Sequence, residues 1–237
     1  MKYKVARAEI QGKIHKEQGT PCQDKTAYII GNDFACVALA DGAGSRAHSE
    51  IGAQITVNAT CCYFKNLRDI ESIDEKDFLR FIIDNLIGSN YSFYDLASTL
   101  LFVFIKNRKA IIGHLGDGMI FGTDKNNTEV LSYPENGEEK NITFFTTDND
   151  AYNHLRVKYV DIPNNYTFLL TSDGGGDCLY SNKDKAPSNA VKIFSEWIQR
   201  NDEADVNQAI DYNLSNVGPK LTHDDISVIE LNICESD

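Results

Sequence analysis

The sequence has 237 residues, 42% of them hydrophobic, and carries a formal net charge of −12 at pH 7. This length and hydrophobic content exclude a disordered chain and predict one globular domain over residues 1–237. The acidic balance disfavours non-specific binding to nucleic acid or to an anionic membrane, since both need clustered Lys and Arg.

The cysteine spacing and the N-terminal sequence narrow the class further. None of the six cysteines lies in a CxxC pair, so the sequence does not predict a zinc ribbon. The N-terminal stretch MKYKVARAEI lacks the apolar core of a signal peptide. No apolar run approaches the ~20 residues that a membrane span needs. These features predict a cytoplasmic protein with free thiols and no membrane contact.

The first part of the chain is predicted to form strands and then helices. Partial alternation of apolar residues predicts a strand up to Ile10. Lys25–Ile30 and Phe34–Ala40 predict two more strands, joined by a hairpin-type turn. Apolar residues at helical spacing then predict helices over Ser49–Leu67 and Ser72–Ser89.

The rest of the chain returns to strands and ends with a helical pair. Residues Ser132–Asp150 are polar and turn-rich and predict a loop or flap. Many antiparallel strands with two pairs of helices indicate an α+β fold, a four-layer α-β-β-α sandwich of two mostly antiparallel sheets flanked by helices. The predicted strands are Ser98–Ile105, Lys109–Leu115, Met119–Thr123, Glu129–Leu131, Leu155–Asp161, Tyr166–Ser172 and Ile226–Leu231, and the predicted helices are Ser188–Arg200 and Glu203–Leu214.

Aspartates recur at the ends of apolar, strand-like runs. Asp41 follows the run VALA, and Asp117 follows IIGHLG. Asp173 follows FLLTS, and Asp224 lies just before ISVIEL. Aspartate is depleted in strands, and an apolar strand does not bury a lone carboxylate cheaply. Because hard cations take oxygen ligands, several such carboxylates favour a metal-dependent hydrolase, and phosphate esters are the favoured substrates.

Taken in order, these blocks resemble the motifs of the metal-dependent serine/threonine protein phosphatases, the PPM or type-2C family, and more narrowly its compact bacterial branch. The resemblance runs from His15 to Leu231. A single Asp-Gly pair is also a common turn, so the match rests on the ordered set. The blocks are GTPCQD (19–24), ADGAGS (40–45), GHLGDG (113–118), TSDGG (171–175) and HDDISVI (223–229).

The resemblance implies a phosphatase of phosphoserine and phosphothreonine proteins, in which a water that bridges two Mg²⁺ or Mn²⁺ ions attacks the ester. It implies that Asp41 bridges the two ions and that the backbone carbonyl of Gly42 is a further ligand. Asp173 and Asp224 match ligands of the first ion. A bridging carboxylate reduces the repulsion between two dications held roughly 3.5–4 Å apart.

Further residues take supporting roles by the same resemblance. Asp24 is expected to help hold metal-bound water, which makes Asp24 and Asp41 the expected catalytic residues. Asp117 is a candidate ligand of a third, looser ion, weighed equally against an ordinary turn residue. Asp225 falls where the family carries an Asn or Asp that supports the site. Neighbours in an extended strand point opposite ways, which fits one ligand at Asp224 and one supporting residue at Asp225. His114 lies within a strand and is expected to be structural.

Several positions depart from the family pattern. Gln23 replaces a frequent Glu ligand, and its neutral oxygen would hold the second ion more weakly. Ala43 stands where animal members carry a His proposed as general acid. His48 is a candidate to replace it, but the favoured interpretation of His48 is a solvated surface histidine.

The phosphate-binding residue departs as well. Many members carry an Arg five residues before the first-block Asp, where this chain has Gly19. Arg46 is the expected replacement, with Lys13 and Lys16 as alternatives. Arg binds phosphate bidentately and Lys acts as a point charge, so the exchange would change substrate preference.

The expected partner is a phosphorylated protein, with a cognate serine/threonine kinase as one candidate. Two other functions stay open: a catalytically weak regulatory module that binds a partner, and a hydrolase of small phosphate esters. The departures at Gly19 and Gln23 favour the module, whereas Asp41, Asp173 and Asp224 oppose it. A calcium-binding module is disfavoured because no Dx[DN]xDG loop is present.

Overall fold

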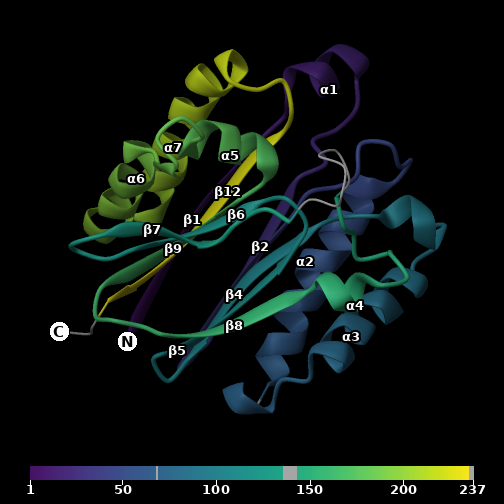
Figure 1. Cartoon of the computed structure of the whole chain (residues 1–237), viewed down its shortest axis with the longest axis horizontal. Helices are drawn as coiled ribbons and strands as arrows, with labels where there is room; N and C mark the ends of the chain where they lie inside the picture. The colour runs from purple at the N-terminus through teal and green to yellow at the C-terminus, as the bar shows by residue number, and fades with distance from the viewer. Residues whose placement is uncertain (68, 136–142, 235–237) are drawn as a thin grey trace. The chain divides into compact units, whose positions relative to one another are not determined.

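The computed structural model describes residues 1–67, 69–135 and 143–234. In this part of the chain the contacts group the residues into two compact units, whose elements are labelled in Figure 1. The first unit comprises Met1–Cys22, Gly118–Tyr133 and Ile162–Asp237, and the second comprises Gln23–Asp117 and Pro134–Asp161. Each unit is described by itself.

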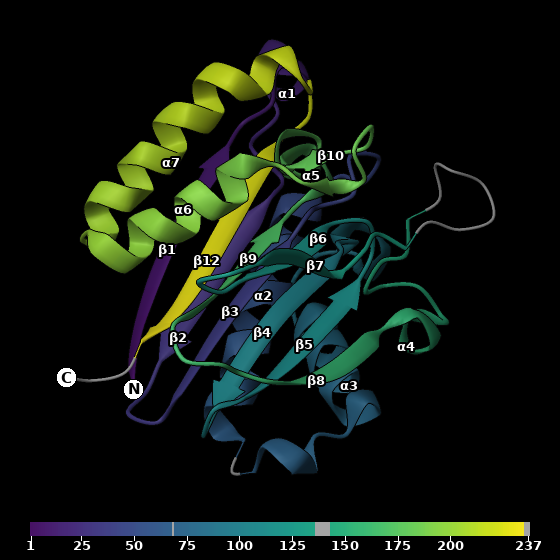
Figure 2. The same ribbon diagram turned by 60° about the vertical axis from the view of Figure 1, so that its left-hand side comes forward.

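The first unit is an antiparallel sheet with helices on one face. Its strand order is β1-β12-β9-β6-β7, and Figure 2 shows α6 and α7 lying over β1 and β12. The strands are β1 (Lys2–Ile10), β6 (Met119–Thr123), β7 (Thr128–Ser132), β9 (Tyr166–Thr171) and β12 (Ile226–Cys234). The helices are α1 (Lys13–Gln18), α5 (Asp173–Leu179), α6 (Asn189–Arg200), α7 (Glu203–Val217) and the 3₁₀ turn η3 (Gly218–Lys220), and a short hairpin joins β10 (Tyr180–Ser181) to β11 (Ala186–Pro187).

Amphipathic spacing explains the helix layer of the first unit. On α7 the buried residues Val206, Ile210 and Leu214 recur every fourth position, which makes one apolar stripe. On α6 the buried residues include Val191, Phe194 and Ile198. Both stripes join one core cluster with side chains of the sheet.

The second unit is also an antiparallel sheet covered by helices. Its strand order is β2-β3-β4-β5-β8. The strands are β2 (Lys25–Ile30), β3 (Phe34–Ala40), β4 (Leu100–Lys106), β5 (Lys109–Leu115) and β8 (Arg156–Asp161). The helices are α2 (Ser49–Asn66), α3 (Glu75–Ile87), α4 (Ala151–His154) and the 3₁₀ turns η1 (Ile70–Ser72) and η2 (Phe93–Leu96).

Aromatic packing holds the core of the second unit. The ring of Phe64 on α2 lies 4.9 Å from that of Phe102 and 4.7 Å from that of Phe104, both on β4. Gly113 on β5 faces Phe102, and a Cβ atom at Gly113 would lie 1.8 Å from that ring. The glycine is therefore required by the close approach of the phenylalanine.

The structure confirms the predicted α+β class, with two mostly antiparallel sheets flanked by helices. Every predicted strand and helix is present. The strands β2, β3, β5 and β6 have the predicted bounds and β1 ends at Ile10 as predicted, whereas the other predicted elements differ at one or both ends. The helix predicted from Ser72 begins at Glu75, because the side chain of Asp74 accepts hydrogen bonds from the next turn. In the predicted flap, residues 136–142 lie outside the described residues. Among the described helices, none has the length and apolarity that a membrane crossing requires.

Glu230 is an exception to the apolar core of the first unit. It lies on β12 between Ala6 of β1 and Leu169 of β9, and its side chain is fully buried. Within the described residues, neither of its carboxylate oxygens has a hydrogen-bond partner. Burial therefore raises the pKa of Glu230 to about 8.

We expect Glu230→Gln to flatten the pH dependence of stability. The folded state keeps the Glu230 proton up to about pH 8, whereas an unfolded glutamate loses it near pH ~4.3. The contribution of Glu230 is therefore fully present below pH ~4.3 and is lost as the pH rises towards 8, by roughly 3 kcal/mol at pH 7. Urea unfolding at pH 5 and pH 8 measures this difference. Glu129→Gln, at an exposed strand position, is the control. If the free energy of unfolding changed equally between pH 5 and pH 8 in wild type and in Glu230→Gln, the raised pKa of Glu230 would be contradicted.

Candidate active site

In the second unit, three predicted site residues lie at one edge of the sheet. Neighbouring strands are antiparallel, so the start of β2, the end of β3, the start of β4 and the end of β5 share this edge. Asp24 precedes β2, Asp41 follows β3, and Asp117 lies just after β5. The fold thus brings these three carboxylates to the same sheet edge.

The backbone at Asp41 is fixed from two sides. The Asp41 N–H donates to the hydroxyl of Thr99 at 2.9 Å, and the Thr99 N–H donates to the Asp41 carbonyl at 2.8 Å. The Gly42 N–H donates to the Gln23 carbonyl at 3.2 Å. A Cβ atom at Gly42 would lie 2.8 Å from the Ser49 carbonyl group, so only glycine fits. Asp41 is therefore presented on a rigid loop.

Asp24 and Gln23 are buried beside this loop. Their exposed fractions are 1% and 4%, which is unusual for a carboxylate and an amide outside regular strands. The side-chain oxygen of Gln23 would lie 3.6 Å from a Cβ atom at Gly44, so it faces the Asp41 loop. Asp24, Asp41 and Gln23 bring carboxylate and amide oxygens to this edge, and hard divalent cations prefer oxygen donors.

The turn that carries Asp117 is tied to the Asp41 loop. Gly116 has a φ of +114°, and a Cβ atom there would lie 2.6 Å from the methyl group of Thr99. The Gly116 carbonyl accepts the Glu135 N–H at 3.0 Å, and the Thr143 hydroxyl donates to the Asp117 carboxylate. Thr99 therefore contacts the backbone on both sides, at Asp41 and at Gly116.

His114 is structural, as its strand position suggested. It is fully buried on β5, and burial, with a smaller effect of the nearby Arg156 cation, lowers its pKa to about 3. The ring is therefore neutral at physiological pH and supplies no general acid. Arg156 in turn pairs with Glu135, with 3.1 Å between Nε and Oε2. The other carboxylate oxygen of Glu135 lies 3.1 Å from Nδ1 of His154.

In the first unit, Asp173 and Asp224 lie at a common sheet edge. β9 ends two residues before Asp173, and its antiparallel neighbour β12 begins two residues after Asp224. A Cβ atom at Gly174 would lie 3.5 Å from that of Asp224 and 2.2 Å from the Asp225 carbonyl oxygen. Asp173 is the first residue of α5, so the glycine run after it is helical and makes close packing contacts.

Asp225 faces α1 and is buried, with an exposed fraction of 2%. Its carboxylate accepts the Gly12 N–H at 2.6 Å and lies 2.9 Å from Nδ1 of His15. Its own N–H donates to the Asp224 carboxylate at 2.8 Å. Asp225 thus supports the backbone next to Asp224, and His15 is a residue that sequence reasoning did not single out.

The phosphate-binding candidates belong to different units. Arg46 is exposed on the loop that follows Asp41. Lys13 and Lys16 lie on α1 of the first unit, where Lys13 is 3.9 Å from Glu17. Gly19, at the position of the family's Arg, ends α1 with a φ of +70°, which a larger side chain rarely adopts. The missing Arg therefore has a local backbone reason.

Among the residues that the structure describes, no group of three or more His, Cys, Asp or Glu side chains forms a ready-made metal site. The structure brings Asp24, Asp41 and Asp117 to one edge in the second unit, and Asp173 and Asp224 to one edge in the first. Burial raises the pKa of the neighbouring Asp177, and the Asp224 carboxylate adds to the effect.

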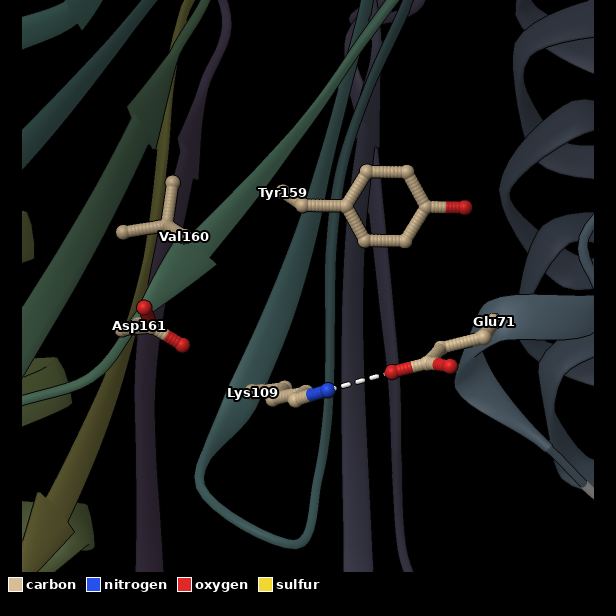
Figure 3. A pocket seen from close by; sticks show the side chains of 5 residues that line it. All are labelled: Glu71, Lys109, Tyr159, Val160 and Asp161. Atoms are coloured by element: carbon tan, nitrogen blue, oxygen red, sulfur yellow. Dashed lines mark hydrogen bonds and ion pairs between the residues drawn. The ribbon is translucent and has the colours of Figure 1, made fainter.

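A cavity of about 360 Å³ in the second unit is separate from these residues. Figure 3 shows the side chains of Lys109 and Glu71 forming an ion pair there, with the ring of Tyr159 alongside. Lys109 begins β5 and Asp161 ends β8, so the cavity lies at the opposite edge of the sheet from Asp117.

The fold matches solved structures of bacterial serine/threonine phosphatases. The S. agalactiae enzyme aligns with a TM-score of 0.68 at 14% identity and covers 99% of this chain and 100% of its own. The Mycobacterium tuberculosis phosphatase PstP aligns with a TM-score of 0.68 at 15% identity, over 98% of this chain and 99% of its own. The catalytic domain of PstP in complex with two manganese ions aligns with a TM-score of 0.66 at 15% identity, over the same shares.

Sequence comparison identifies the family. Serine/threonine-protein phosphatase 3 of Escherichia coli (strain K12) is 27% identical over 171 residues, which is 66% of this chain and 68% of that protein. The sequence profile of the protein phosphatase 2C family matches residues 11–215. The chain therefore belongs to the protein phosphatase 2C family of metal-dependent protein phosphatases.

We expect His15→Ala to weaken the support of Asp225. The change removes the ring from a buried carboxylate, at a cost of about 1–3 kcal/mol in the free energy of unfolding. If Asp224 is a ligand, the Mn²⁺ concentration for half-maximal hydrolysis should also rise. His15→Asn can place an amide N–H near the position of Nδ1 and should restore most of both effects. Ile14→Ala, at a half-exposed position on α1, is the control, and equal behaviour of His15→Ala and Ile14→Ala would contradict the role of His15.

Proposed function

We propose that this phosphatase hydrolyses phosphoserine and phosphothreonine esters of proteins with bound Mg²⁺ or Mn²⁺. The observation that carries the proposal is the Asp41 loop. Hydrogen bonds with Thr99 and Gln23 fix its backbone, and it lies at the same sheet edge as the buried Asp24. Such a set of oxygen donors fits a hard divalent cation.

The proposed ligands follow the family motifs. Asp41 and the Gly42 carbonyl would be metal ligands in the second unit, and Asp173 and Asp224 would be metal ligands in the first. Asp24 would hold water at the site. A third ion would be bound at Asp117, the carboxylate that accepts a hydrogen bond from Thr143.

The ions, when bound, would lower the pKa of water and neutralise phosphoryl oxygens. The residues of the chain would position the reactants. Asp41 is rigid before any ligand arrives, because both its backbone groups are bonded to Thr99. Arg46, on the same loop, is exposed, and its planar guanidinium group would bind the phosphate.

A covalent nucleophile near Asp173 is not supported. Burial and the nearby Asp177 raise the pKa of Cys178 to about 11, so its thiol stays protonated. The Ser172 hydroxyl accepts the Ser227 N–H at 3.1 Å, which gives it a structural role. Direct attack by water is the step that the remaining groups support.

We also propose that residues 1–237 act as one domain, because the family match over residues 11–215 includes segments of both units. The proposed location is the cytoplasm. The substrate would be a phosphorylated protein, with a cognate serine/threonine kinase as a candidate. A catalytically weak regulatory module is the second candidate function, and the lack of a ready-made metal cluster among the described residues favours it.

We expect hydrolysis of p-nitrophenyl phosphate and of a phosphothreonine peptide to need Mn²⁺ or Mg²⁺ and to stop with EDTA. Asp41→Asn and Asp173→Asn should each lower kcat/KM by more than about 100-fold, because each removes a ligand charge. Asp33→Asn and Asp211→Asn, at exposed positions of the second and first units, are the matched controls.

The alternatives give different outcomes in the same assay. A folded chain without turnover in any metal would overturn the proposal in favour of the regulatory module. Turnover of small esters with no turnover of phosphopeptides would favour a small-molecule hydrolase.

A further inference from the structure

Two exposed tyrosines lie on the segment before β4. Tyr91 and Tyr94 expose 42% and 58% of their surface, whereas Leu96 of the same segment is fully buried. The ring of Tyr91 packs against that of His48, with 4.6 Å between the ring centroids. His48 precedes α2, at the end of the loop that starts with Asp41. The exposed rings thus belong to a segment that is held in place by the buried Leu96 and by the contact with His48.

Hydrogen bonds place this segment against the Asp41 loop along its length. The His48 N–H donates to the Asp95 carbonyl at 3.1 Å, and the Ala43 N–H donates to the Ala97 carbonyl at 3.0 Å. Two residues further on, Thr99 exchanges its hydrogen bonds with Asp41. The two segments therefore run side by side, from the tyrosines at one end to Asp41 at the other.

The packing beneath the tyrosines is rigid. A Cβ atom at Gly52, in α2, would lie 2.0 Å from the Leu96 carbonyl oxygen, so the helix and η2 touch through their backbones. The ring of Tyr94 also contacts that of Phe93, with 5.5 Å between centroids. A rigid aromatic surface loses little conformational entropy on binding, which favours its use in recognition.

The side chains around Tyr91 and Tyr94 indicate what kind of molecule would bind them. Tyrosine faces attract apolar groups and the cations of Lys and Arg. Two partly exposed acids add negative charge: Asp95, next to Tyr94, and Glu50, in the first turn of α2. The net charge of the chain is −12. Because hydrogen bonds join the two segments as far as Asp41, a peptide whose phosphoryl group binds at Asp41 would extend its flanking residues along this surface.

We propose that His48, Tyr91 and Tyr94 form a docking surface for the residues that flank the phosphoserine or phosphothreonine of a protein substrate, with Lys or Arg preferred in the flank. The proposal rests on the proposed function. It assigns the phosphatase a preference for basic, extended phosphopeptides over small esters.

The test compares the double variant Tyr91→Ala/Tyr94→Ala with wild type on three substrates: p-nitrophenyl phosphate, a phosphothreonine peptide with Arg and Lys flanks, and the same peptide with Glu flanks. We expect the ratio of kcat/KM for the basic peptide to that for the small ester to fall about tenfold, through KM. The preference for basic over acidic flanks should shrink in parallel. Tyr212→Ala, at a 70% exposed position on α7, is the control and should keep the wild-type ratio.

Several outcomes would overturn the docking surface. An unchanged ratio in the double variant, or a wild type that does not distinguish the two flanks, would show that these tyrosines do not read the substrate. Loss of self-association in the variant, measured by light scattering, with an unchanged ratio would assign the surface to a second copy of the chain. A wild type that hydrolyses neither ester nor peptide would instead refute the proposed function, so the two failures are distinguishable.

Discussion

The reciprocal hydrogen bonds between Asp41 and Thr99 are the constraint on which the second unit's site depends. They join the end of β3 to the residue before β4, and on the Asp41 side they are made by the backbone N–H and carbonyl. The same threonine packs against Gly116, next to Asp117. The Thr99 side chain therefore links two acidic turns, and these turns follow β3 and β5, whose residues are mostly buried.

The first unit achieves a similar result by a different route. Asp224 is held by its neighbour Asp225, which in turn is held by Gly12 and His15 from the start of the chain. Support comes here from a short helix, whereas in the second unit it comes from adjacent strands. Gly19 ends that helix in a left-handed conformation, which accounts for the missing arginine. The departure from the family pattern is thus part of how α1 is built.

The strands and long helices could be predicted because their apolar periodicity is a local property of the sequence. The positions of the acidic blocks could be predicted as well, because each block directly follows or precedes an apolar, strand-like run. The contact between His15 and Asp225 could not, since it joins residues 210 positions apart and nothing in the sequence around His15 indicates a role for that residue. The start of α5 at Asp173 was also missed, because a run of glycines is typical of loops. Close packing against Asp225 and Thr171 leaves no room for a Cβ atom at Gly174 or Gly175. The strand predicted from Ser98 begins at Leu100, because Ser98 and Thr99 bind the Asp41 loop instead.

The buried Glu230 gives folding of this chain a proton stoichiometry. At pH 7 the folded molecule holds the carboxyl proton and the unfolded chain has released it, so folding takes up about one proton per molecule from the solvent. Heat measured on unfolding then contains the ionisation enthalpy of whichever buffer accepts that proton. Calorimetry in phosphate and in Tris would give different apparent enthalpies for the same transition, and the difference would count the proton directly.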